Sequence, residues 1–317
     1  MIDVRVAEVL LKPETDELRF LPEGPYATTR LGELSWVAIQ HGKNKLHGSV
    51  NLLDLNTRKN RSYALPGRPG FAFACDDGHS FVVGCERSLG RFSTKTQAWD
   101  VFCEGVDSDV DNTIINDGMI WEDSLLFGTK DLEFKTKKAG LYLYRGSDKK
   151  LIRLLDDQIC SNGKAIRKTT AGLELIDIDS PTRQIAAYAL DIAAAKLGPR
   201  RVLLDLTSDP AVPDGMILTP EGSGVIVSMF HPGGAEHGET RHYDLATGNL
   251  VTVWKTPGAP QNTCPALVEL DNKIALVITT AVENMDLETR NKRPDSGCLF
   301  VGETDFDAVS SMPIFPI

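Results

Sequence analysis

Four oxygen-bearing side chains stand beside glycines at regular intervals along the chain. Asn116 and Asn162 are 46 residues apart, Asp214 follows 52 residues later, and Glu23 precedes Asn116 by 93 residues. Each taken alone is the kind of polar residue that caps a strand in a turn. Held together, two carboxylates would repel each other unless a cation neutralised them. Oxygen ligands without clustered His or Cys favour a hard divalent ion such as Ca²⁺.

The intervening sequence predicts the scaffold that could bring these residues together. Short runs rich in β-branched and aromatic residues occur throughout, bounded by turn residues, as in 34–39, 81–84, 140–144, 225–227 and 274–278. Only 190–197 could pass for a helix, of barely two turns. The fold class is therefore all-β.

A repeated turn predicts how the strands are arranged. An apolar residue followed by a polar Asp, Ser, Thr or Gly turn recurs six times, 39 to 57 residues apart, near 53–57, 92–96, 144–148, 188–191, 243–248 and 300–304. This interval is the length of a four-stranded propeller blade. We predict one six-bladed β-propeller domain over 1–317, with the turn between the third and fourth strands of each blade. A two-sheet sandwich would not explain the period. The early strand 3–9 is expected to pair into the last blade and close the ring.

Charge and cysteine content exclude several classes of function. A net charge of −10 disfavours binding to nucleic acids. The first residues, which include Asp3 and Arg5, form neither a secretory signal nor a membrane span. Six dispersed cysteines without a CxxC pair are typical of reduced thiols, so we expect a cytoplasmic protein. Separately, we expect no membrane partner, and a monomer or weak homo-oligomer.

Four short motifs give the chain a resemblance to the SMP-30/gluconolactonase/luciferin-regenerating-enzyme family, which includes regucalcin. The motifs are Glu23-Gly24-Pro25, Asn116-Asp117-Gly118, Ser161-Asn162-Gly163 and Pro213-Asp214-Gly215-Met216, in order and at blade spacing. The resemblance implies that Glu23, Asn162 and Asp214 ligate one metal ion, with Asn116 contacting substrate or a metal-bound water. It also implies hydrolysis of a small lactone, with Ca²⁺, Zn²⁺, Mn²⁺ or Mg²⁺ as the ion, Ca²⁺ being our first expectation.

One departure from the family pattern concerns substrate binding. Many members have Arg two residues before the Asn-Asp-Gly motif, where this chain has Ile114. An apolar side chain cannot bind a sugar hydroxyl or carboxylate. We expect loops 41–45, 86–87, 130–138, 231–237 and 283–296 to line the mouth of the channel. Within them, Arg87 or one of Lys135, Lys137 and Lys138 could replace the missing Arg.

Two functions follow as alternatives. In the first, metal-activated water attacks a lactone carbonyl, Asp214 orients or deprotonates that water, and Asn116 positions the substrate. In the second, the chain is a non-catalytic calcium-binding propeller that acts through protein partners. An open coordination position favours the first.

Overall fold

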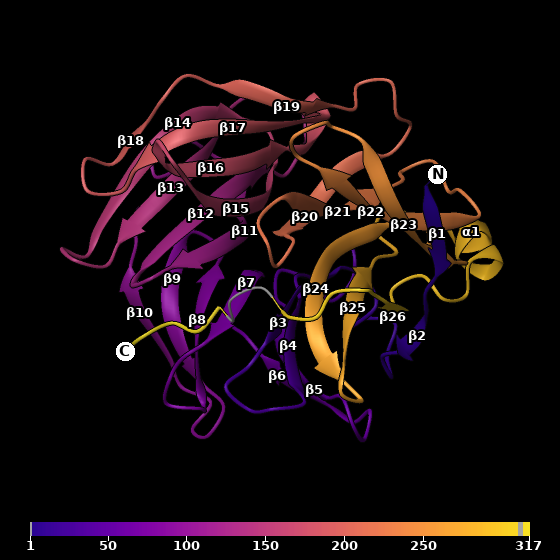
Figure 1. The fold of residues 1–317 in the computed structure, drawn as a ribbon. Helices are drawn as coiled ribbons and strands as arrows, with labels where there is room; N and C mark the ends of the chain where they lie inside the picture. Colours follow the sequence, from indigo (N-terminus) through magenta and orange to yellow (C-terminus); the bar gives the residue numbers. More distant parts are fainter. Residues whose placement is uncertain (1, 310–312) are drawn as a thin grey trace.

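Six sheets surround a common axis in the computed structural model, which describes residues 2–309 and 313–317 (Figure 1). The first three blades consist of β3 (Pro22–Ala27), β4 (Glu33–Ala38), β5 (Ser49–Asp54) and β6 (Asn60–Ala64); β7 (Pro69–Ala74), β8 (Ser80–Cys85), β9 (Ser88–Ser93) and β10 (Trp99–Cys103); and β11 (Thr113–Trp121), β12 (Ser124–Asp131), β13 (Ala139–Arg145) and β14 (Lys150–Gln158).

The other three blades follow in chain order. They consist of β15 (Ser161–Thr169), β16 (Gly172–Asp179), β17 (Gln184–Asp191), β18 (Lys196–Leu197) and β19 (Arg201–Asp205); β20 (Val212–Leu218), β21 (Gly224–Phe230), β22 (His237–Asp244), β23 (Leu250–Pro257) and β1 (Asp3–Val6); and β24 (Asn262–Leu270), β25 (Lys273–Thr280), β26 (Leu299–Glu303) and β2 (Glu8–Leu11). The predicted six-bladed propeller is confirmed.

The core is built from side chains that point alternately to the two faces of the second strand in each blade. In β8, Phe81 and Val83 pack against blade one, whereas Val82 packs against blade three. A strand with both faces covered must be apolar on both, which is why β8 is buried throughout. Each of the six hydrophobic clusters in the described residues lies between two neighbouring blades. The core is thus a ring of six blade interfaces around a polar axis.

In blades one to five the repeated turn lies where the sequence predicts it, between the third and fourth strands. In blade six, residues 300–304 instead end the third strand, β26, because the fourth strand is β2 from the N-terminal segment. In blade one the Asp54 carboxylate accepts hydrogen bonds from the backbone N–H of Asn56 and Thr57, at 3.0 and 2.8 Å. In blade five Asp244 accepts from Thr247 N in the same way, at 2.8 Å. An Asp that bonds to its own turn explains why this residue type recurs.

Helix is confined to two short segments among the described residues. Residues 190–197 are not helical, because β17 continues to Asp191 and turns into β18. The α-helix, α1 (Leu287–Lys292), and a single 3-10 turn, η1 (Ser180–Thr182), both lie in loops after second strands. Asp286 caps α1 by accepting from Thr289 N at 2.7 Å. Within the described chain, no helix is both long and apolar enough to cross a bilayer.

The six cysteines are free, as expected, and five of them are buried. Burial raises the pKa of the Cys75 and Cys85 thiols to about 12, which keeps them protonated and unreactive at neutral pH.

The N-terminal segment closes the ring differently from the prediction. Residues 3–9 do not form one strand in the last blade. β2 pairs antiparallel with β26 in blade six, as expected for closure, but β1 adds to blade five as a parallel partner of β23. The chain crosses between the two blades at Ala7, which is buried among Trp254 and Phe300. The N-terminus therefore covers two sheet edges rather than one.

Closure by β2 can be tested with two neighbouring side chains on that strand. Leu10 is buried between blades six and one, whereas Val9 is 43% exposed. We expect Leu10→Ala to lower the free energy of unfolding by about 2–4 kcal/mol, and Val9→Ala by less than about 1 kcal/mol. Chemical denaturation of both variants measures the difference; equal losses would show that β2 does not seal the ring.

Candidate functional site

All six innermost strands lose register with their neighbours at the same level of the channel. The shifts fall between Glu23 and Tyr26, Pro69 and Phe71, Ile115 and Gly118, Ser161 and Lys164, Pro213 and Met216, and Asn262 and Pro265. A bulge of this kind leaves residues unpaired and turns their side chains out of the sheet. The four residues singled out from the sequence, Glu23, Asn116, Asn162 and Asp214, all lie at these bulges.

The first strands pack directly against one another around the axis, which leaves no room for side chains between their backbones. A Cβ at Gly163 would lie 2.5 Å from the Met216 Cβ and 2.8 Å from the Asp214 oxygen. A Cβ at Gly215 would lie 2.7 Å from the Thr263 oxygen. The glycines after Asn162 and Asp214 are therefore required for the close approach of blades four, five and six.

A chain of hydrogen bonds fixes the two amides. Asn116 Nδ2 donates to Asn162 Oδ1 at 2.7 Å and to the Ser161 carbonyl at 2.9 Å. Asn162 Nδ2 donates to Ser180 Oγ at 2.8 Å, and Ser180 Oγ donates to the Pro213 carbonyl at 2.7 Å. The chain links blades three, four and five and sets the orientation of both amides. Ser180 takes part although sequence reasoning gave it no role.

The two carboxylates influence each other. Burial raises the pKa of Glu23 well above its usual range, and the nearby Asp214 and Asp117 raise it further. Burial and Asp117 act in the same direction on the pKa of Asp214. Lys130 opposes the shift in both groups. Neither carboxylate has an Arg or Lys partner within 4.0 Å among residues 2–309 and 313–317. Two such acids favour the entry of a cation.

The donor set determines which cation could bind. The described residues contain no group of three or more His, Cys, Asp or Glu side chains suited to hold a metal. Amide oxygens would therefore have to complete the coordination of an ion held by Glu23 and Asp214. Asn162 Oδ1 accepts one hydrogen bond, from Asn116, and keeps a second lone pair. Two carboxylates and an amide oxygen fit a hard divalent ion.

The structure shows where the residues predicted to bind substrate lie. Ile114 is 2% exposed and pairs across the sheet with Lys130. The Arg87 guanidinium donates to the backbone carbonyls of Thr113 and Asp107, at 3.1 and 3.2 Å. Lys138 forms an ion pair with Asp131 at 3.2 Å.

The remaining loop lysines, Lys135 and Lys137, are exposed. Lys130, at the start of this loop, is a lysine whose charge lowers the pKa of both Glu23 and Asp214. Sequence reasoning included it in the mouth but did not select it. The signal that points to Lys130 is its position opposite Ile114 on the neighbouring strand, and only the strand register reveals that position.

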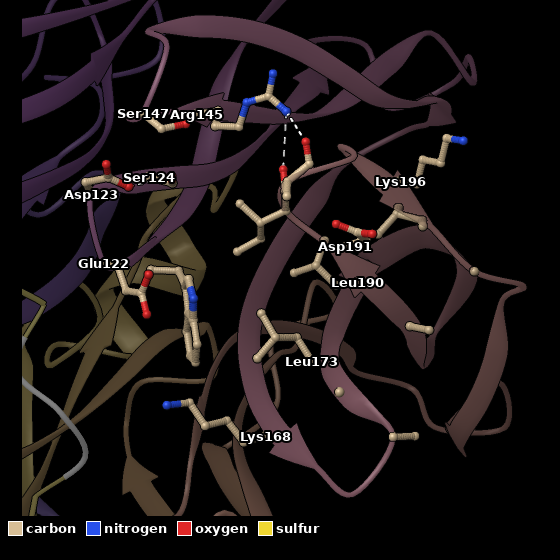
Figure 2. A pocket seen from close by; sticks show the side chains of 18 residues that line it. Glu122, Asp123, Ser124, Arg145, Ser147, Lys168, Leu173, Leu190, Asp191 and Lys196 are labelled. Carbon is tan, nitrogen blue, oxygen red and sulfur yellow. Dashed lines mark hydrogen bonds between the residues drawn. The ribbon is translucent and has the colours of Figure 1, made fainter.

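The channel is hollow on the side away from the loops after the second strands. A cavity of about 580 Å³ lies there, bordered by Tyr26, Asp117, Lys164 and Cys264 and by Ile314 from the C-terminal segment. Asp117 and Gly118 separate it from Asn116. A wider, shallower hollow of about 1000 Å³ lies between blades three and four (Figure 2). Its Arg145 donates to the Ile192 and Ala193 carbonyls, and it contains none of the four site residues.

Comparison with known proteins agrees with the fold and the motifs. Residues 21–282 match the model of the SMP-30/Gluconolactonase/LRE-like region. The chain is 28% identical to zebrafish (Danio rerio) regucalcin over 60% of its own length and 61% of the relative's. The aligned segment thus spans about three fifths of that curated relative.

Solved structures share the fold across nearly the whole chain. A calcium-binding protein, regucalcin, from Agrobacterium tumefaciens matches with a TM-score of 0.81 at 21% identity, covering 99% of this chain and 98% of that one. A gluconolactonase from Xanthomonas campestris matches with a TM-score of 0.65 at 14% identity, covering 90% and 86%. Identities this low establish the fold alone.

The raised carboxylate pKa values predict how metal-free stability depends on pH. A carboxyl that is protonated in the folded state and ionised in the unfolded state costs stability as the pH rises above the ordinary carboxyl pKa. We expect metal-free wild type to lose stability as the pH rises from about 4 toward neutrality. Asp214→Asn should flatten this slope and raise the melting temperature at pH 8 by a few degrees.

Thermal unfolding in a chelator at several pH values makes this measurement. Glu221→Gln, at an exposed position of the same blade, is the control. An Asp214→Asn protein with the wild-type slope would show that Asp214 is ionised and stabilised in the fold.

Proposed function

Because the chain belongs to the SMP-30/gluconolactonase/LRE-like family, we propose that it is a hydrolase that opens a small lactone at a divalent metal ion, with Ca²⁺ as the first candidate and Zn²⁺, Mn²⁺ or Mg²⁺ as the others. One observation supports this most: Glu23, Asn116, Asn162 and Asp214, from four different blades, meet at the bulges around one axis. Packing alone does not require polar residues at these positions. Their gathering is what a reaction centre needs.

Glu23, Asn162 and Asp214 are the residues that would hold the ion. When bound, a divalent ion polarises a carbonyl and lowers the pKa of water. The amide of Asn162 is fixed for this role by Asn116 and Ser180. The Asp214 carboxylate accepts no side-chain hydrogen bond within the described residues, so its second oxygen remains available to a water molecule.

In this reaction Asp214 accepts a proton from water and later gives it to the leaving oxygen. The oxygen of a water molecule held by Asp214 adds to the lactone carbonyl carbon, and its proton passes to the Asp214 carboxylate. The bond between that carbon and the ring oxygen then breaks. The ring oxygen takes the proton from Asp214 and becomes a hydroxyl, so lactone and water give one hydroxy acid. Asn116, which is 5% exposed beside Asn162, would position the lactone.

The relatives named regucalcin support a second candidate. One solved structure of the same fold is described as a calcium-binding protein, so this chain could bind Ca²⁺ through the same residues without catalysis and act through a protein partner. This alternative predicts tight Ca²⁺ binding with no turnover of any lactone.

A lactone panel decides between the two. Metal-stripped protein is assayed on sugar acid lactones and aliphatic lactones with each of the four ions added back. We expect at least one ion to restore hydrolysis, and Asp214→Ala to lower kcat/KM by about 10²-fold or more. Glu221→Ala, an exposed carboxylate in the same blade, is the control and should retain wild-type activity. Full activity in Asp214→Ala would contradict the mechanism.

A further inference from the structure

Lys130 is a largely buried residue whose ammonium has no anionic partner. The residue is 6% exposed, and in the part of the chain that the structure describes its ammonium has no carboxylate within 4.0 Å and no hydrogen bond. An ammonium held largely out of bulk water is stabilised when an anion reaches it. The neighbouring loop cations differ, because Lys138 is paired with Asp131 and Arg87 is satisfied by two backbone carbonyls.

The strand register explains where the Lys130 side chain emerges. Lys130 at the end of β12 lies opposite Ile114 of β11, and directly opposed residues of an antiparallel pair project from the same face of the sheet. Ile114 and Asn116 are two residues apart on β11, and Asn116 contacts blade four through Asn162. The backbone of Lys130 also bridges to Cys160 at the start of blade four. Lys130 thus projects on the side of blade three that holds the site amides.

The charge of Lys130 acts on the two acidic residues of the same site. Lys130 lowers the pKa of both Glu23 and Asp214, which come from blades one and five. The Phe134 ring lies 5.9 Å from the Lys130 ammonium and covers it from the loop side. Glu283, from the loop after β25, is a further charge near Asp214. A divalent cation held by Glu23 and Asp214 would compensate their negative charge. The Lys130 ammonium would then be available to an anionic group of the substrate.

We propose that Lys130 is the specificity-determining cation of this site, binding a free carboxylate on the lactone substrate in place of the arginine that the family pattern has at position 114. This inference rests on the proposed function and names its substrate class: lactones of dicarboxylic sugar acids and similar anionic lactones. An ammonium forms a charge-assisted hydrogen bond with a carboxylate, which is about twice as strong as a bond to a neutral hydroxyl.

Two lactones that differ in one group test the proposal. D-glucaro-1,4-lactone has a free carboxylate where D-glucono-1,4-lactone has a primary alcohol. We expect wild type to prefer the glucaro compound. Lys130→Met should lower kcat/KM for it by about 10–100-fold and for the glucono compound by less than about threefold. Lys130→Arg should keep most of the preference, and Lys135→Met, which removes an exposed lysine from the same loop, should leave both rates unchanged.

A second measurement does not depend on turnover. The Lys130 ammonium repels a cation at Glu23 and Asp214, so we expect Lys130→Met to bind Ca²⁺ more tightly than wild type in calorimetry, whereas Lys135→Met should not differ. In calcium-saturated wild type, D-glucarate should bind more tightly than D-gluconate, and Lys130→Met should abolish that difference.

The outcomes separate this proposal from the proposed function. If lactones are hydrolysed but wild type shows no preference for the carboxylate, or Lys130→Met lowers both rates equally, the role of Lys130 is wrong and the lactonase proposal stands. If no lactone is hydrolysed but the glucarate preference disappears in Lys130→Met, the lactonase proposal fails and the anion site stands. Equal binding of glucarate and gluconate to wild type would overturn the anion site.

Discussion

Close approach of six strands at one level of the axis is the constraint on which this structure depends. The first strands must bulge there, because continuous pairing would direct alternate side chains into backbones that are already in contact. At Gly70 the crowding is extreme, since a Cβ would lie 1.9 Å from the Asn116 oxygen. Most residues at the bulges are glycine or carry a polar side chain, as Glu23, Asn116, Asn162 and Asp214 do. A requirement of packing thus produces the same geometry that a metal centre needs.

The arrangement has an energetic cost. Burial together with Asp214 and Asp117 raises the pKa of Glu23, and Lys130 is a charge among the described residues that opposes the rise in the pKa of both Glu23 and Asp214. The six apolar interfaces between blades supply the stability that makes this tolerable. The proposed function lies at the axis and the apolar core at the interfaces, so a change at one need not disturb the other.

The sequence was sufficient for the fold and for the four axial residues because both repeat. Turns such as the one at Asp54 recur once per blade, and Glu23, Asn116, Asn162 and Asp214 keep the same phase. Features set by pairing do not repeat and could not be predicted. Nothing local distinguishes β1, parallel on blade five, from β2, which closes blade six. The hydrogen bonds of Arg87 to the carbonyls of Thr113 and Asp107 could not be predicted either, because only the folded backbone identifies those acceptors.

Lys130 shows why a motif taken from one strand can miss a cation that a neighbouring strand supplies to the proposed site. Residues opposite each other on neighbouring antiparallel strands share a face, so a cation absent from β11 at Ile114 can be supplied from β12 at nearly the same point. Ile114 itself is 2% exposed and packs as a buried apolar residue. A lysine is shorter than an arginine and carries a point charge rather than a planar fork, which favours a single carboxylate oxygen over a bidentate contact. In the proposed site, the substrate preference would therefore depend on which strand of blade three carries the charge, a property of the sheet and not of either segment alone.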